Sequence, residues 1–321
     1  MDPHNGAIKT LVSSPTFDPN AFLSPLSDDA WTKMGLNNPL LNRATCALYP
    51  PASTFKLAAM TAALEDKLID THLDVVCNGH IVFGGRRYYC IRHEGHGRMS
   101  PRDALAVSCN IPLFNLARKI KIDRLAFYAD KYGLGQKTNL ALPEKAGLVP
   151  TTRWKKQALH ERWWKGETLS TSIGQGYLLV TPLQIARMVG AVCTGSLIKP
   201  RLLETEAIEQ TPINVSNETL NFLRGAMHDA AIFGSAQRLR FIAGFDIFGK
   251  TGTAQVCGLN LQNIHYKHHL EHGWFCGYFT YKGSSPLVLI ILMENVGSSS
   301  LAVSMADKFL RGYRELQTKP S

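Results

Sequence analysis

The sequence predicts an α+β fold in which helices cover both faces of an antiparallel sheet. Three observations support this class. A strand-like segment lies early in the chain, helical segments fill the middle, and several late strand-like segments are followed by an amphipathic helix. With 321 residues, of which 45% are hydrophobic, the chain is also long enough to bury a large core.

The first two thirds of the chain are expected to form one strand and then a series of helices. Residues 6–12 alternate loosely after an Asn-Gly turn, which predicts a strand. After a Pro-Pro pair, residues 53–64 are rich in Ala, Leu and Met and predict a buried helix. Residues 72–99 are glycine-rich and predict a loop. Further helices are expected at 101–107, 111–119, 122–132 and 182–193.

The C-terminal third carries strand-like segments and a closing helix. Strands are expected at 245–256, 274–281 and 287–294, and the helix at 299–316. We therefore expect the sheet to come from about residues 1–48 and 240–321, and a helical subdomain from about residues 53–195.

The net charge of +10 favours anionic partners, but the basic residues are scattered. The densest cluster surrounds Trp154, Trp163 and Trp164, and no nucleic-acid-binding motif accompanies it. We expect no nucleic-acid partner. The longest strongly apolar run, residues 287–293, has the length of a strand and not of a membrane-spanning helix.

A serine and a lysine stand three residues apart at the start of the expected helix 53–64. In this arrangement Ser53 and Lys56 lie on one helix face, and an unprotonated lysine there can take the serine proton. A second S-x-x-K string begins at Ser196 and runs straight into Pro200. No helix would hold that pair together, so we interpret it as incidental.

Two further strings make the first one informative. Ser108, Cys109 and Asn110 form an S-x-N string between two expected helices. A Lys-Thr-Gly-Thr string begins at Lys250 on an expected strand, where Gly252 would let a ligand approach the backbone. The order S-x-x-K, S-x-N, K-T-G is typical of serine enzymes that interact with penicillin.

With these motifs, the sequence resembles the transpeptidase domain of class B penicillin-binding proteins, specifically the penicillin-binding protein 2 group of the cell-elongation machinery. The resemblance covers nearly the whole chain. Other matching strings are Ser14 to Asn20, Asn42 to Ala44, Tyr49 to Pro51, Gly95 to Gly97, Ser172 to Gly176, Thr181 to Gln184 and Thr253 to Gln255. Ala52 departs from the family, which usually has Gly there, and Thr251 replaces a frequent Ser.

The resemblance implies a penicillin-binding, serine β-lactamase-like fold. This is an α/β/α sandwich with a five-stranded antiparallel sheet and an all-helical subdomain. Full-length members also carry a cytoplasmic tail, one transmembrane helix and a pedestal region. The present sequence contains none of these, so we expect it to be an excised catalytic domain. The full-length protein would then lie at the periplasmic face of the bacterial inner membrane.

The resemblance also assigns the catalytic roles. Ser53 would be the acylated nucleophile and Lys56 its base. Ser108 would relay a proton to the leaving amine, Asn110 would bind the amide of the donor peptide, and Lys250 would support Ser108 electrostatically.

The substrate carboxylate would lie against Thr251, Gly252 and Thr253, and the backbone amides of Ser53 and Thr253 would form the oxyanion hole. The implied reaction is D,D-transpeptidation of peptidoglycan stem peptides, with β-lactams acylating the same serine. By resemblance alone, the partners would be a SEDS-type glycosyltransferase and scaffold proteins of the elongation complex.

Three alternatives to transpeptidation stay open. A serine β-lactamase needs a base for deacylation, but Glu161 lacks the Asn four residues later that the class A pattern requires. A D,D-carboxypeptidase would release D-Ala without an acceptor amine. A β-lactam sensor or idle scaffold would not need the intact motifs.

A possible structural metal site is formed by Cys77, Cys90, His96 and Cys109, which fall within 33 residues. Three thiolates and one imidazole suit tetrahedral zinc, and some penicillin-binding protein 2 sequences resemble this one in placing metal ligands at these positions. A Cys77–Cys90 disulfide or buried free thiols are the alternatives. Catalysis itself is expected to need no cofactor.

Two other patterns are interpreted as loops. The cluster His265, His268, His269 and His272 could bind metal at helical spacing, but we interpret it as a polar loop beside the cleft. Two consecutive glycosylation sequons begin at Asn214 and Asn217 and are interpreted as loop chemistry.

Overall fold

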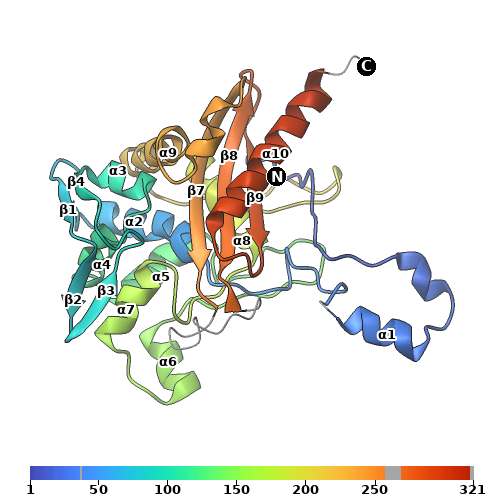
Figure 1. The fold of residues 1–321 in the computed structure, drawn as a ribbon, viewed down its shortest axis with the longest axis horizontal. Coiled ribbons are helices and arrows are strands. Elements are labelled where there is room, and N and C mark those ends of the chain that lie inside the picture. The colour runs from blue at the N-terminus through green and yellow to red at the C-terminus, as the bar shows by residue number, and fades with distance from the viewer. Residues whose placement is uncertain (37, 257–268, 319–321) are drawn as a thin grey trace.

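The computed structural model describes residues 1–36, 38–256 and 269–318. Its main sheet is antiparallel, with the strand order β7 (Phe245–Ala254), β8 (His272–Tyr281) and β9 (Leu287–Met293) (Figure 1). Successive side chains of β8 point to opposite faces. Trp274 and Tyr278 therefore join one hydrophobic core, whereas Phe275 and Phe279 join another.

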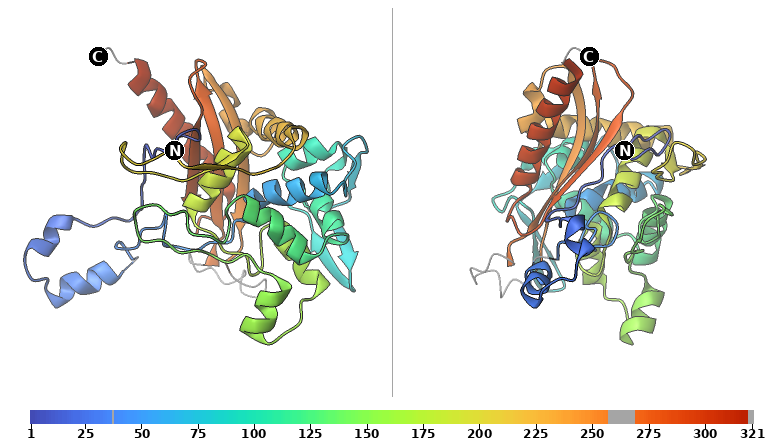
Figure 2. Two further views of the ribbon diagram at one scale, coloured as in Figure 1. Left: turned by 180° about the vertical axis from the view of Figure 1, so that it is seen from behind. Right: turned by 90° about the vertical axis from the view of Figure 1, so that its right-hand side faces the viewer.

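Helices cover both faces of this sheet, as the sequence predicted. Helix α10 (Ser299–Thr318) crosses one face, where Ala302, Val303, Ala306 and Leu310 pack on the side of Phe275 and Phe279. Helix α8 (Pro182–Thr194) packs on the opposite face, which the rear view displays (Figure 2). A capping box between Thr181 and Gln184 begins α8, and Gly195 ends it in the left-handed conformation.

The main sheet has three strands in the described part of the chain, fewer than the five expected. The N-terminal segment does reach its edge: Met1 N donates to Val288 O (3.0 Å), and Val288 N donates to Met1 O (2.8 Å). Pro3 has no N–H with which to extend this pairing. Residues 6–12, expected as a strand, contribute only a single bridge, between Ala7 and Arg201.

The middle of the chain is helical, but not all-helical. Its helices are η2 (Ala52–Phe55), α2 (Lys56–Glu65), α3 (Pro101–Ala106), α4 (Ile111–Ala117), α5 (Ile122–Lys131), α6 (Thr152–Leu159) and α7 (Lys165–Ser172). Four short strands accompany them: β1 (Val75–Cys77), β2 (His80–Phe83), β3 (Arg86–Tyr89) and β4 (Gly97–Met99).

These strands lie in the segment 72–99, where the sequence predicted a loop, so that prediction and the all-helical subdomain were wrong. β1 pairs with β4, and β2 pairs with β3 across Gly84 and Gly85, which both have positive φ. Strands of three or four residues are too short to display a readable alternation of side chains, which is why the sequence did not reveal them.

The remaining elements connect these parts. β5 (Ser196–Ile198) and β6 (Gln210–Pro212) form a hairpin, and α9 (Asn217–Ile232) leads through η3 (Gln237–Phe241) to the sheet. Ser216 caps α9, so the segment interpreted as loop sequons begins a helix. An arm with η1 (Pro19–Leu23) and α1 (Asp28–Gly35) projects from the body (Figure 1).

The described helices include none that combines the length and apolar character needed to cross a bilayer.

Candidate active site

Ser53 lies in the short 3-10 turn η2, immediately before α2. It is the only residue between Pro51 and Ala63 that is not fully buried. The helix that follows is packed on all sides, because its residues from Lys56 to Ala63 are all buried. The fold therefore presents one hydroxyl at the surface of an otherwise enclosed segment.

The turn before Ser53 has a strained backbone. Ala52 has a φ of 50°, in the left-handed region that alanine rarely adopts. Its N–H donates to Gly174 O at 2.8 Å. A Cβ on Gly174 would lie 1.9 Å from Ala52 O, so only glycine fits there. Gly252 of β7 approaches the same turn, since a Cβ there would lie 3.3 Å from Pro51 O.

Lys56 extends from α2 toward the S-x-N string. Its Nζ donates to Asn110 Oδ1 at 2.6 Å and to Ser108 O at 2.7 Å. Longer contacts join the same Nζ to Cys109 O at 3.2 Å and to Ser108 Oγ at 3.4 Å. The helix that carries Ser53 is thereby tied to all three residues of the string.

Ser108 is the meeting point of two lysines. Lys250 Nζ donates to Ser108 Oγ at 2.7 Å, and Lys56 Nζ lies 3.4 Å from the same oxygen. Ser108 has a φ of 62°, which directs this turn between helices α3 and α4. Three motifs that are far apart in the sequence therefore converge on one hydroxyl.

Burial controls the charge of both amines. Desolvation lowers the pKa of Lys56 to about 8, although Cys109 and Cys90 oppose this shift. The pKa of Lys250 lies well below its usual value because it is buried and because the charge of Lys56 repels a second positive charge. A neutral amine, which can accept a proton, is accordingly accessible near neutral pH.

The Lys-Thr-Gly-Thr string lies on β7, as predicted, beside the nucleophile turn. Thr251 Oγ1 donates to Ser235 Oγ at 2.7 Å, and Thr253 O accepts from Gln175 Nε2 at 3.2 Å. Ser299 N, at the start of α10, donates to Thr253 Oγ1 at 3.3 Å. No sequence pattern indicated Ser235 or Ser299, because they reach this strand only through the tertiary fold.

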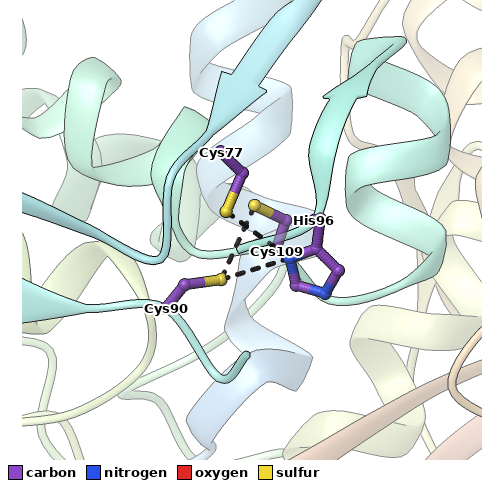
Figure 3. Close-up of side chains that lie close together, drawn as sticks. All are labelled: Cys77, Cys90, His96 and Cys109. Atoms are coloured by element: carbon purple, nitrogen blue, oxygen red, sulfur yellow. Dashed lines mark hydrogen bonds between the residues drawn. The ribbon is translucent and has the colours of Figure 1, made fainter. Parts of the chain in front are cut away.

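The four candidate metal ligands also converge (Figure 3). Their ligand atoms all lie within 4.8 Å of one another, and the side chains point toward a common centre. Cys77 Sγ and Cys90 Sγ each lie 3.5 Å from His96 Nδ1, and Cys90 Sγ lies 3.7 Å from Cys109 Sγ. All three cysteines are free thiols, so the alternative of a Cys77–Cys90 disulfide is not what the structure contains.

This cluster contacts the S-x-N string directly. Cys109 belongs to the cluster and is also the central residue of the S-x-N string. Asn110 N donates to Cys90 Sγ at 3.4 Å. Asn110 Nδ2 donates to Tyr89 O at 3.0 Å, which links the string to the end of β3. The position of Asn110 therefore depends on the residues around the cluster.

Comparison with known proteins identifies the family to which this chain belongs. The family model described as the penicillin-binding protein transpeptidase domain matches residues 1–311. The chain belongs to this family. Among curated relatives, the peptidoglycan D,D-transpeptidase MrdA of Acinetobacter baumannii is 31% identical over 329 residues, which cover 95% of this chain and 48% of the relative. The chain thus spans about half the length of the curated relatives it matches.

Solved structures of the family agree with the fold. The complex of penicillin-binding protein PBP2 with MreC from Helicobacter pylori has a TM-score of 0.90 at 29% identity, covering 98% of this chain and 59% of that one. A structure on coordinated polymerization and crosslinking by a peptidoglycan synthase complex has a TM-score of 0.88 at 34% identity. It covers 100% of this chain and 56% of that chain. The expected penicillin-binding transpeptidase fold is confirmed.

In this penicillin-binding domain, the alanine at position 52, where the family usually has glycine, has a structural consequence. The family's usual glycine suits a positive φ, whereas alanine at a φ of 50° is strained. The surrounding contacts with Gly174 must therefore hold the turn in place.

The other sequence patterns lie elsewhere. Ser196 belongs to strand β5, and the lysine of its S-x-x-K string, Lys199, bonds to Glu209, so this string forms no second site. His265 and His268 lie outside the described residues. His272 begins β8 and accepts a hydrogen bond from Asn295 N at 3.0 Å.

Proposed function

We propose that this domain is a D,D-transpeptidase that cross-links peptidoglycan stem peptides through an acyl-enzyme on Ser53. The observation that carries the proposal is the convergence of Lys56 and Lys250 on Ser108, beside the accessible Ser53. The name of the relative MrdA, a peptidoglycan D,D-transpeptidase, supports the same reaction. Its role would be in cell elongation and shape.

In the first half-reaction, the Ser53 hydroxyl attacks the carbonyl of the penultimate D-Ala. The Oγ–C bond forms, the C–N bond to the terminal D-Ala breaks, and the serine proton passes to neutral Lys56. Ser108 delivers a proton to the departing amine and takes a replacement proton from Lys56, while its hydrogen bond from Lys250 orients its hydroxyl. The backbone N–H groups of Ser53 and Thr253 stabilise the oxyanion.

In the second half-reaction, an amine of a neighbouring strand attacks the ester. The new C–N bond forms as the ester C–O bond to Ser53 breaks. The amine gives up a proton to neutral Lys56, and Lys56 passes this proton to the departing Ser53 oxygen. Asn110 binds the donor amide, and Thr251, Gly252 and Thr253 bind the substrate carboxylate along β7. A β-lactam would acylate Ser53 in the same way and stay attached, because its ring-opened amine does not leave the site.

The proposal is tested by intact-protein mass after incubation with penicillin. We expect one stable adduct in the wild type and in Ser196→Ala, and none in Ser53→Ala. Ser196 is the matched control, since it heads the other S-x-x-K string but lies in a strand. Rapid drug hydrolysis with a transient adduct would indicate a β-lactamase instead. The absence of any adduct on folded wild-type protein would refute an acylating serine.

We also propose partners and a location. The structures with MreC and of a peptidoglycan synthase complex support scaffold proteins and a SEDS-type glycosyltransferase as partners of the full-length protein. That protein would be anchored with this domain at the periplasmic face of the inner membrane.

Finally, we propose that Cys77, Cys90, His96 and Cys109 bind a structural zinc ion. Tetrahedral zinc holds two sulfurs about 3.8 Å apart, and a sulfur about 3.5 Å from a nitrogen. The separations of 3.7 Å between Cys90 and Cys109 and 3.5 Å from each of two sulfurs to His96 fit this geometry. The ion would fix the S-x-N string and take no part in proton transfer.

A further inference from the structure

A partly buried hydrogen-bond network lies before the turn that carries Ser53. Tyr49 OH donates to Glu294 Oε1 at 2.7 Å, and Arg43 Nε donates to Glu294 Oε2 at 3.0 Å. The side chain of Arg43 is 13% exposed and that of Glu294 33% exposed, so this ion pair is partly shielded from water. None of these residues belongs to the three catalytic motifs.

Tyr49 connects this network to the backbone that leads to Ser53. Its N–H and C=O both pair with Val180, at 2.9 Å each. Its ring contacts Trp274 edge-on, and Trp274 Nε1 donates to Pro50 O at 3.1 Å. Tyr49 and Pro50 are thus held on both sides, only a few residues before the nucleophile.

Glu294 supplies the fixed end of the network. It lies in the turn that directly follows β9, the strand at the other edge of the sheet from β7. Burial raises its pKa, but the hydrogen bonds from Tyr49 and Arg43 outweigh that effect and keep the pKa low. The carboxylate is therefore charged, and a charged acceptor makes the stronger hydrogen bond to Tyr49.

We propose that Arg43, Tyr49 and Glu294 are positioning residues that hold the strained turn before Ser53 in register with the Lys-Thr-Gly-Thr strand. The inference rests on the proposed function. Ala52 adopts a φ of 50° against its own preference, so the turn needs anchors outside itself. Gly174 fixes it from one side, and this network fixes it from the side of the sheet.

The test separates binding from chemistry in the reaction with penicillin. For Tyr49→Phe and Glu294→Gln, we expect the first-order acylation rate constant to fall roughly 10- to 100-fold, because small misplacements of a reacting group are costly. The dissociation constant of the non-covalent complex should change less than about twofold, because no residue of the network is placed against the substrate. The double variant should be acylated no more slowly than the slower of the two single variants, because both changes act on the same hydrogen bond between Tyr49 and Glu294.

The chain offers a matched control. Tyr128 OH donates to Asp66 Oδ1 at 2.6 Å, and Arg124 donates to the same carboxylate, in a network of the same chemistry away from the turn. Tyr128→Phe should lose stability but acylate at the wild-type rate. If Tyr49→Phe does not fold, Arg43→Lys replaces it in the comparison.

Two results would overturn the inference. Folded Tyr49→Phe and Glu294→Gln that acylate as fast as wild type would remove the positioning role and leave the proposed function intact. Wild-type protein that penicillin does not acylate at all would overturn the proposed function, and this inference with it.

Discussion

At the residue scale, the site depends on backbone conformations that residues other than glycine rarely adopt. Ala52 and Ser108 both have positive φ, and each stands next to or within a catalytic motif. Gly174 also has positive φ and accommodates the carbonyl of Ala52. Such conformations persist only where neighbouring contacts hold them, and functional sites are where they gather.

Replacing Gly174 by alanine should therefore damage the site. The new Cβ would lie 1.9 Å from Ala52 O, in a backbone conformation with a φ of +77°. We expect Gly174→Ala to lower the free energy of unfolding by at least about 2 kcal/mol and to slow penicillin acylation at least about tenfold. Urea unfolding and the rate of adduct formation measure the two effects.

Gly176→Ala is the control for backbone strain alone. Gly176 has nearly the same φ, +80°, but the nearest atom to its Cβ would be 3.8 Å away. Gly176→Ala should lower the free energy of unfolding by about 1–2 kcal/mol and leave the rate of acylation unchanged. Equal acylation rates in the two alanine variants would contradict the proposed close fit between Gly174 and Ala52.

At the element scale, packing between helices stabilises the helical region. Helix α2 begins at Lys56 and is buried along most of its length by neighbouring helices. Helix α5 is one of them, and the contact between these helices ends in Asp66, the residue that follows α2. Asp66 accepts hydrogen bonds from Arg124 and Tyr128 of α5.

This contact makes part of the stability depend on pH. The hydrogen bonds from Arg124 and then from Tyr128 lower the pKa of Asp66 below its unfolded value of about 4, although burial acts in the opposite direction. A lowered folded pKa means that the stabilisation is complete above about pH 4 and is lost as the pH falls through the folded value. Because Arg124 is partly exposed, this stabilisation is limited to about 1 kcal/mol.

Asp66→Asn should therefore be about 1 kcal/mol less stable than wild type at pH 7, and the two proteins should approach equal stability as the pH falls through the lowered folded pKa of Asp66. Urea unfolding across this pH range measures the difference. A gap that stayed constant with pH would mean that the Asp66 charge does not stabilise the fold.

At the scale of the whole molecule, the sheet and the helical region meet at the proposed active site. β7 brings Lys250 to Ser108, while Ser299, the first residue of α10, donates to Thr253 Oγ1. The small strands β1 to β4 form a third unit with a limited core, in which Cys77, Cys90 and Cys109 are buried. The proposed zinc ion would join this unit to the S-x-N string, which the sheet and α2 also contact.

Removal of zinc should consequently affect both metal content and catalysis. We expect about one zinc ion per chain in wild type and in Cys46→Ser, and almost none in Cys90→Ser, by elemental analysis. Cys46 is a free thiol outside the cluster and serves as the control. Loss of the ion should slow acylation about 10- to 100-fold. A wild-type protein that binds no zinc when supplied with it would refute the metal site.

Much of the fold was readable from the sequence because long elements repeat their pattern many times. Helices α5, α8 and α10 and strands β7, β8 and β9 lie within a few residues of their predicted bounds. The strands β1 to β4 are too short for such a pattern. Helix α9 was missed because its first turn resembles a polar loop, although Ser216 is a good N-terminal cap.

The sequence alone determined the chemistry available to this protein, because the order and spacing of three motifs and of four candidate metal ligands are properties of the chain. Only the tertiary structure decided which hydroxyl both lysines reach, which glycine the nucleophile turn requires, and which carboxylate anchors that turn. Arg43, Tyr49 and Glu294 stand up to 251 residues apart, so no local pattern relates them. Contacts between distant segments form only when the core packs, and that packing assembles the site.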